Sequence, residues 1–140
     1  MKIDQKILDT LTEQAKASPR LRMNLDLRNS PEDNSQRMLN AMEPGSQVAI
    51  HRHCKTSETM VVLRGRLVVD LYNASGEACE ESVELTPNGA AVAINVPLGQ
   101  WHTARSLESG TVFIGVMDGH YEPLGPEDIL GGGMSANIYE

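Results

Sequence analysis

The 140-residue sequence has no long apolar run and no cluster of basic residues. No stretch approaches the roughly eighteen consecutive apolar residues that a membrane-spanning helix needs. The first residues, MKIDQKILDT, lack the apolar centre of a signal peptide, so we expect a cytoplasmic protein without membrane contact. The formal net charge of −7 and the scattered lysines and arginines argue against nucleic acid as a partner.

The sequence has only two cysteines, Cys54 and Cys79, which are too few for a disulfide framework. Both fall in predicted connections, so we expect free thiols in a reducing compartment. Cys54 adjoins His53, but side chains alternate along an extended chain, and its thiol should point away from the face that carries His53. We therefore expect that Cys54 is not a metal ligand.

A chain of this length forms one domain with one core by default. Residues 4–17 have helical periodicity, with Ile7, Leu8 and Leu11 on one side, and Pro19 ends the helix. Beyond it, β-forming runs alternate with turn residues, which predicts about eight to ten antiparallel strands in a sandwich or barrel. The predicted strands cover residues 21–27, 36–42, 47–53, 58–63, 66–72, 83–85, 91–96, 101–105 and 111–117.

We therefore expect an N-terminal helix over residues 1–20, a β-barrel over 21–120 and a loosely held C-terminal tail over 121–140. The tail is rich in proline and glycine. His120 follows the last predicted strand, and we expect it on the surface or at an interface. Since barrels with exposed strand edges and a protruding helix often pair, we also expect a homodimer.

Three histidines and one glutamate are predicted to converge. His51 and His53 are two residues apart, so on a strand both imidazoles point to one face. The next apolar run begins at Glu58, and a hairpin with the His51 strand would bring Glu58 close to His53. His102 follows the turn at residues 97–100 and enters from a second hairpin. This donor set suits one divalent transition metal, with Fe, Mn, Zn, Ni and Cu all open.

The spacing of these residues resembles the first signature of the cupin superfamily. Gly45, five residues, His51-x-His53, four residues, Glu58, six residues and Gly65 match that signature at every spacing. An isolated H-x-H pair is weak evidence of a metal site, because short motifs match by accident, whereas several coinciding spacings are specific. The resemblance implies a double-stranded β-helix, a small jelly-roll-like barrel, with a bound metal.

The second cupin signature is matched less closely. Pro97, Gly99 and His102 have its spacing, but Gly89 lies seven residues before the proline instead of five, and Ser106 replaces a common asparagine. Residues 22–123 are similar to the bacterial WbuC-type cupin-fold metalloproteins, which implies an association with O-antigen and surface polysaccharide gene clusters and no settled reaction. That similarity lies in Gln36–Ala41, His51–His53, Trp101–Thr103 and Gly119–Tyr121.

Three residues of the strand over 36–42 are candidates for lining a ligand pocket. If this strand pairs with the histidine strand through the turn at 43–46, Gln36, Met38 and Asn40 share the histidine face. Gln36 and Asn40 can contact a ligand or simply satisfy backbone groups and histidine protons, and both interpretations stay open.

Two arginines are further candidates for the pocket. Arg64 lies an even number of residues after Glu58, so on a regular strand both side chains point to the same face. Together with Arg105, Arg64 can form an anion clamp at the barrel mouth. Both can equally be solvated. Arg52 and Trp101 alternate away from the neighbouring histidines, so we expect them on the outer face.

The leading functional hypothesis is a metal-dependent enzyme that acts on a small oxygen-rich metabolite, such as a sugar derivative of surface polysaccharide metabolism. An isomerase, an epimerase or an oxygenase is compatible with such a centre. Epimerisation needs a base, and no second acid or base beyond Glu58 is evident on the predicted inner face. The alternatives are a non-catalytic metal-dependent ligand-binding or sensor module and a site that only stabilises the barrel.

Overall fold

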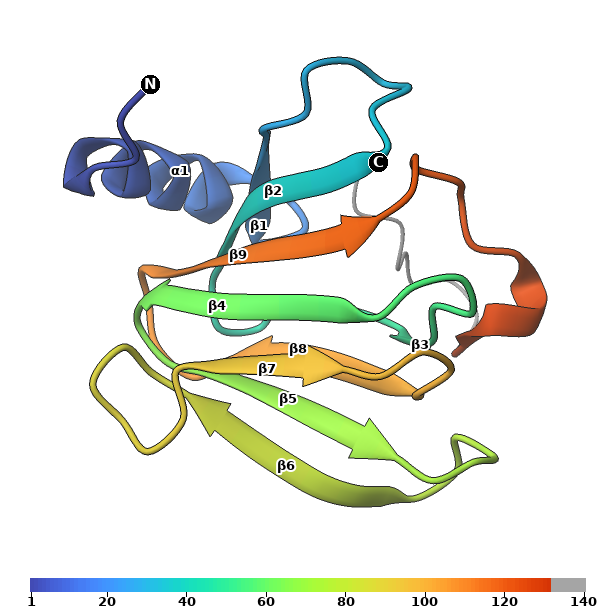
Figure 1. The fold of residues 1–140 in the computed structure, drawn as a ribbon. Helices are drawn as coiled ribbons and strands as arrows, with labels where there is room; N and C mark the ends of the chain where they lie inside the picture. Colours follow the sequence, from blue (N-terminus) through green and yellow to red (C-terminus); the bar gives the residue numbers. More distant parts are fainter. Residues whose placement is uncertain (132–140) are drawn as a thin grey trace.

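The structure is a computed structural model that describes residues 1–131. Within them, ten strands form two antiparallel five-stranded sheets, and one α-helix lies outside the sheets (Figure 1). The first sheet has the strand order β1-β2-β9-β4-β7 and the second has the order β10-β3-β8-β5-β6. The elements are α1 (Gln5–Ala17), β1 (Arg22–Asp26), β2 (Ser35–Met42), β3 (Ile50–His51), β4 (Glu58–Arg64), β5 (Leu67–Tyr72), β6 (Cys79–Leu85), β7 (Ala93–Val96), β8 (His102–Ser106), β9 (Thr111–Asp118), the 3₁₀ helix η1 (Pro126–Asp128) and β10 (Ile129–Leu130).

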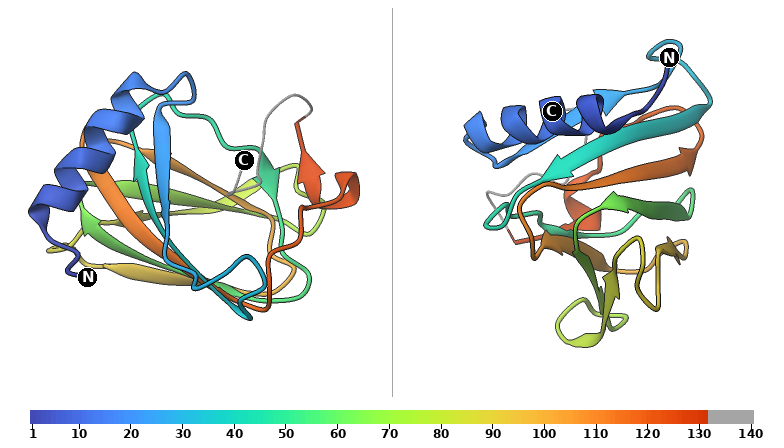
Figure 2. Two further views of the ribbon diagram at one scale, coloured as in Figure 1. Left: turned by 90° about the horizontal axis from the view of Figure 1, so that it is seen from above. Right: turned by 90° about the vertical axis from the view of Figure 1, so that its left-hand side faces the viewer.

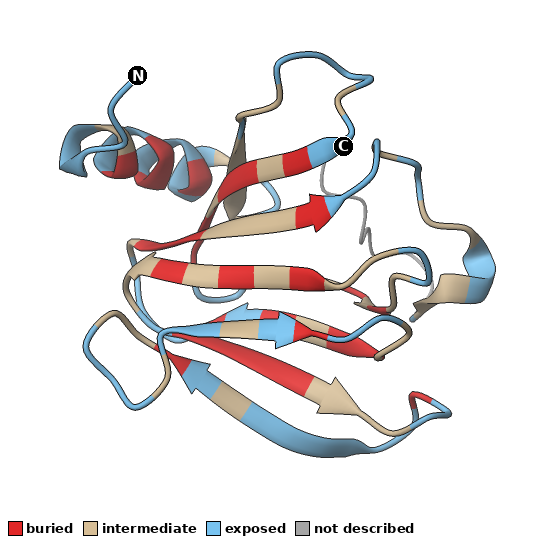
Figure 3. Ribbon diagram, in the orientation of Figure 1, coloured by how far each residue is buried: buried red, intermediate tan, exposed pale blue. Residues whose placement is uncertain are grey.

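Apolar side chains from the inner faces of both sheets meet to form the main core. Figure 3 shows the alternation along β4, where buried and half-buried residues follow one another. The buried core residues are Met42, Met60, Val62, Leu67, Val69, Leu85, Val96, Ala104 and Phe113. The all-β class predicted from the sequence, with one N-terminal helix, is confirmed.

The helix α1 lies across the outer face of the first sheet, as two further views show (Figure 2). Asp4 caps it, because Asp4 Oδ1 accepts a hydrogen bond from the Ile7 amide at 3.1 Å. Leu8, Leu11 and Ala15 are buried against outward-facing residues of β2 and β9. The predicted helix is thus confirmed, and among residues 1–131 no helix is long and apolar enough to cross a membrane.

The two hairpins predicted around the histidines do not form. β3 and β4 lie in different sheets, and so do β7 and β8. β2 pairs with β1 and β9 rather than with β3. The connections at residues 52–57 and 97–101 therefore cross between the sheets, and turn composition alone does not distinguish such a crossing from a hairpin.

The segment after β9 returns to the second sheet instead of leaving the barrel. In β10, Ile129 pairs with His51 and Leu130 pairs with Ile50. The Arg52 guanidinium binds Asp128 at 2.8 Å. The part of the expected loose tail that precedes residue 132 is therefore attached to the barrel, and residues 132–140 lie outside the described part of the chain.

Candidate metal centre

Three histidines and one glutamate lie together between the two sheets. His51 in β3 pairs directly with His102 in β8, His53 follows β3, and Glu58 begins β4 in the facing sheet. Each residue offers one ligand atom, and these four atoms all lie within 4.8 Å of one another. The ring centroid of His51 lies 4.4 Å from that of His102 and 5.1 Å from that of His53. The structure thus brings together the four residues that the sequence singled out.

Backbone carbonyls orient two of the imidazoles. The Nδ1 of His51 lies 2.8 Å from the carbonyl oxygen of Ala49, and the Nδ1 of His102 lies 2.9 Å from that of Gln100. Because a carbonyl oxygen only accepts, each Nδ1 donates a proton to it, and each Nε2 is the nitrogen that faces the other members of the group. Both Nε2 atoms are therefore ready to coordinate a cation.

Glu58 presents its carboxylate to two of the imidazoles. Its Oε1 lies 3.2 Å from the Nε2 of His102 and 3.5 Å from the Nε2 of His53. Burial raises the pKa of Glu58, but its contacts with the imidazoles of His102 and His53 lower that pKa by more, and it lies well below its usual range. The carboxylate is therefore an anionic oxygen donor at neutral pH.

This donor set fits a divalent transition metal. Three imidazole nitrogens and one carboxylate oxygen are ligands that such metals accept in proteins, and octahedral coordination leaves two positions for other ligands. His51, Glu58 and His102 are all buried, so bulk water has little access from their side. The four ligand atoms lie within 4.8 Å of one another, so adjustment of the side chains can bring them to one ion.

Acid is expected to destabilise the metal-free protein through His51. Burial, followed by repulsion from His102 and His53, lowers the pKa of His51 from 6.5 to about 3. Between these values the unfolded chain binds a proton at His51 and the folded chain does not. The free energy of unfolding should therefore fall with falling pH, by about 1 kcal/mol per pH unit from this residue.

Urea unfolding of chelator-treated protein between about pH 6 and pH 4 measures this dependence. His51→Gln removes the titrating group and should make the dependence shallower by about the same amount. An equally steep dependence in His51→Gln would show that His51 does not resist protonation in the folded protein.

A cavity of about 550 Å³ adjoins the four residues on the side of His53. Its walls come from the connection after His53, from Gln36 and Met117, and from the segment that follows β9. Within the described chain, His53 is the one member of the group that lines the cavity. A ligand in this cavity would thus approach the other three residues past His53.

The three predicted pocket residues of β2 have different positions. Leu39 and Ala41 pack beneath α1, so Gln36, Met38 and Asn40 face the barrel interior. Met38 is buried, and Asn40 Nδ2 donates a hydrogen bond to the Met38 carbonyl at 3.2 Å. Of the three, Gln36 lines the cavity.

Arg64 does not lie beside the four residues. A β-bulge between Val62 and Arg64 shifts the register, so Arg64 loses the parity of Glu58. Its guanidinium reaches α1, where it donates to Asp9 Oδ1 at 2.7 Å and to Thr12 Oγ1 at 3.0 Å. Arg64 therefore ties β4 to the helix.

Arg105 points outward from the second sheet, since it lies three residues after His102 in β8 and has the opposite parity. Its Nε donates to Asp70 Oδ2 at 2.9 Å, and half of the side chain is exposed. The anion clamp predicted from Arg64 and Arg105 does not form, because carboxylates hold the two guanidinium groups on opposite outer faces.

Four other residues near the histidines lie outside the group, as the alternation of side chains predicts for Arg52, Trp101 and Cys54 and as the position after the last predicted strand indicates for His120. The Arg52 guanidinium stacks 4.5 Å above the Trp101 ring on the outer face. Cys54 is exposed, with its Sγ 3.5 Å from Asp128 Oδ1. The exposed His120 lies at the rim of the cavity.

The sequence did not reveal the cavity wall formed after β9. The sequence predicts a loose tail over residues 121–140, because prolines and glycines dominate its composition. The attachment of this wall depends on distant partners, such as Lys55 with Glu122 and Arg52 with Asp128. The similarity at Gly119–Tyr121 was the one signal that pointed to it.

Comparison with known proteins identifies the fold. Residues 3–85 match the family model described as Domain of unknown function (DUF6016), a range that includes His51, His53 and Glu58 and ends before His102. A search of the curated proteins finds no match.

Several solved structures are similar to this chain. KdgF from Halomonas sp. is 18% identical, with a TM-score of 0.58 and coverage of 74% of this chain and 84% of that one. TT1209 from Thermus thermophilus is 22% identical, with a TM-score of 0.59 and coverage of 85% and 98%. A cupin 2 domain-containing protein from Halorhodospira halophila is 19% identical, with a TM-score of 0.58 and coverage of 75% and 70%. These similarities show that the chain has the cupin fold.

Proposed function

Because this chain belongs to the family described as Domain of unknown function (DUF6016), whose name assigns no reaction, we propose its function from its own site. The protein is a cupin-fold metalloprotein in which His51, His53, Glu58 and His102 hold one divalent transition metal. It acts as a metal-dependent enzyme on a small oxygen-rich metabolite such as a sugar derivative. The observation that carries this proposal is the approach of four ligand atoms to within 4.8 Å of one another beside a cavity of about 550 Å³.

A metal bound there would polarise a carbonyl or hydroxyl oxygen, or activate dioxygen, at coordination positions that the protein does not fill. The chain's own residues set the conditions for this chemistry. The carbonyls of Ala49 and Gln100 hold His51 and His102 in the required tautomer. The cavity beside His53 gives a metabolite space to reach the open side of the site.

An acid or base next to the bound metabolite distinguishes an isomerase or epimerase from an oxygenase. An isomerase or epimerase needs a proton carrier, and the cavity rim contains one that the sequence did not reveal: His120, whose Nε2 lies 3.2 Å from Glu122 Oε1. An oxygenase needs no such residue. The similarity of the sequence to WbuC-type cupins supports a role in surface polysaccharide metabolism. The strand edges and the protruding helix support a homodimer, and the two free cysteines suit the cytoplasm.

Elemental analysis of protein purified without chelator and without affinity nickel tests the proposal first. We expect about one transition metal ion per chain. A screen of nucleotide sugars and small hydroxy acids by thermal shift, with product analysis of each hit, then tests catalysis. A protein without metal contradicts the proposal, and a metal-loaded protein that binds a hit without converting it favours the binding or sensor module.

A further inference from the structure

Gln36 is a buried polar residue that faces the cavity without satisfying all of its hydrogen-bonding capacity. The side chain is 7% exposed and lines the same cavity as His53. Its Oε1 is buried and has no hydrogen-bond partner among residues 1–131. Because a buried amide without a partner is destabilising, a proton donor that enters the cavity would relieve a deficit already present in the protein.

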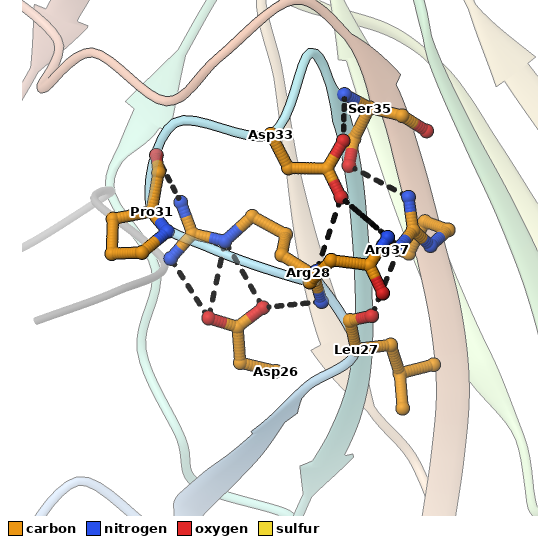
Figure 4. Close-up of polar contacts among 8 residues, drawn as sticks. Asp26, Leu27, Arg28, Pro31, Asp33, Ser35 and Arg37 are labelled. Atoms are coloured by element: carbon orange, nitrogen blue, oxygen red, sulfur yellow. Dashed lines mark hydrogen bonds and ion pairs between the residues drawn. The ribbon is translucent and has the colours of Figure 1, made fainter.

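The backbone on both sides of Gln36 is held by contacts of its neighbours. In the loop between β1 and β2, Asp33 Oδ2 accepts a hydrogen bond from Arg37 Nη2 at 3.2 Å, within the set of contacts that Figure 4 shows. The carbonyl of Asn34 also accepts from the amide of Gly119 at 2.7 Å, which joins this loop to the cavity wall. These contacts fix both sides of Gln36.

The cavity is acidic. Four carboxylates and one ammonium group line it. The carboxylates belong to Asp118, Glu122, Glu127 and Asp128. Lys55 is paired with Glu122, and Asp128 is paired with a guanidinium outside the cavity, whereas Asp118 and Glu127 have no ion pair within residues 1–131. The sequence beyond residue 131 adds no lysine or arginine.

Met117, Pro123 and Leu124 add apolar surface to the wall, which also includes His53, Cys54, Thr56, His120 and Tyr121. Carboxylates and an amide oxygen accept hydrogen bonds from hydroxyl groups, and apolar side chains pack against C–H groups. A carboxylate or phosphate in the same place would meet like charges and could not donate to Gln36 Oε1. A bound metal attracts anions. The preference of the cavity for uncharged hydroxyl groups over carboxylates and phosphates therefore applies to the part of the ligand farther from the metal.

We propose that the cavity binds the metal-distal part of the ligand and that this part is uncharged and rich in hydroxyl groups. One hydroxyl donates to Gln36 Oε1, and others donate to Asp118 and Glu127. This inference rests on the metal site proposed above and narrows its substrate class. The substrate is a polyol or sugar compound whose one end binds the metal as an anion or chelator and whose other end is uncharged.

D-gluconate and D-glucarate test the inference on metal-loaded protein. Both present an α-hydroxy carboxylate to the metal, but the far end is a hydroxymethyl group in gluconate and a carboxylate in glucarate. Isothermal titration calorimetry should give a Kd about tenfold lower for gluconate. Elemental analysis comes first: a metal-free protein overturns the proposed function itself. Glucarate binding as tight as that of gluconate in metal-loaded protein overturns this inference alone.

A double variant and its control test whether Asp118 and Glu127 cause the preference for gluconate over glucarate. The double variant Asp118→Asn, Glu127→Gln should reduce the preference for gluconate to near parity, because both carboxylates that repel glucarate are gone. The matched control Glu80→Gln, Glu81→Gln removes the same charge from β6 on the exposed edge of the second sheet. An equal loss of preference in the control would mean that overall charge, not the cavity, selects the ligand.

Gln36→Met keeps the apolar part of the side chain and removes the amide. It should weaken gluconate binding about tenfold or more while leaving the melting temperature unchanged or raised, since a buried amide oxygen without a partner among residues 1–131 disappears. Gln47→Met, at an exposed position, is the control and should change neither value. A lower melting temperature with unchanged gluconate affinity in Gln36→Met would make Gln36 a structural residue and overturn its assigned role.

Discussion

Replacing His102 by alanine is expected to lower metal affinity by more than about a hundredfold and to leave the fold in place. Loss of a residue that only supports a metal ligand typically costs about 10–100-fold, and His102 supplies the ligand atom itself. The apolar core between the sheets does not include His102. Without metal, the variant should unfold with a free energy about 1–3 kcal/mol lower, because buried Glu58 loses one of its two imidazole partners.

His120→Ala is the matched control for this prediction. His120 is exposed and stands outside the group of four, so its loss should leave the metal content unchanged. Elemental analysis and competition with a chelator measure the difference, and circular dichroism checks the fold. Equal metal content in His102→Ala and the unchanged protein would remove His102 from the ligand set.

Gly65→Ala is expected to lower the free energy of unfolding by about 3–5 kcal/mol, the largest effect on stability that we anticipate for a single added methyl group. Gly65 has φ +86°, which strains any residue with a Cβ. A Cβ there would also lie 2.6 Å from the Cα of Thr111, and this backbone atom belongs to β9 and has little freedom to move. Urea unfolding measures the loss.

Gly99→Ala separates the two contributions. Gly99 has a similar φ of +81°, but an added Cβ would meet no atom within 4 Å. This control should therefore cost only the strain of the left-handed conformation, about 1–2 kcal/mol. Similar small losses in both variants would contradict the close approach of the strands at Gly65.

The helix and most strands could be predicted from the sequence because their signals are local. Ile7, Leu8 and Leu11 repeat with helical spacing, and Asp4 is a suitable cap. The strands predicted from β-forming runs between turn residues correspond to β1 through β9 within a few residues. β10 escaped prediction because two residues carry no periodicity, and its pairing with β3 is a contact between distant parts of the chain.

The pairing of the strands could not be predicted, because the residues of a turn do not determine which sheet the next strand joins. The segments around His53 and Gly99 have the composition of hairpin turns, yet each crosses between sheets. The four side chains converge even though the predicted hairpins are crossings between the sheets. Side chains from the inner faces of two packed sheets interdigitate, so the face on which a side chain lies mattered more than which strand its own strand pairs with.

The alternation of side chains along a strand also explains which residues predicted to line the pocket do so and which do not. Gln36 reaches the cavity, since alternation holds along β2. Arg64 points to α1, since a bulge after Val62 breaks the alternation, and no residue type in that run announces it. The acidic wall with Glu122 and Glu127 was missed for another reason. Its segment is held through ion pairs and backbone contacts with distant residues, which the sequence alone does not display.

A crystal structure of the protein, measured at the absorption edge of the metal found by elemental analysis, tests the central claim most directly. We expect one anomalous peak about 2.0–2.2 Å from one ring nitrogen each of His51, His53 and His102 and from a carboxylate oxygen of Glu58. A metal-containing protein whose peak lies at other side chains, or a fully loaded crystal with no peak among these four, would contradict the account.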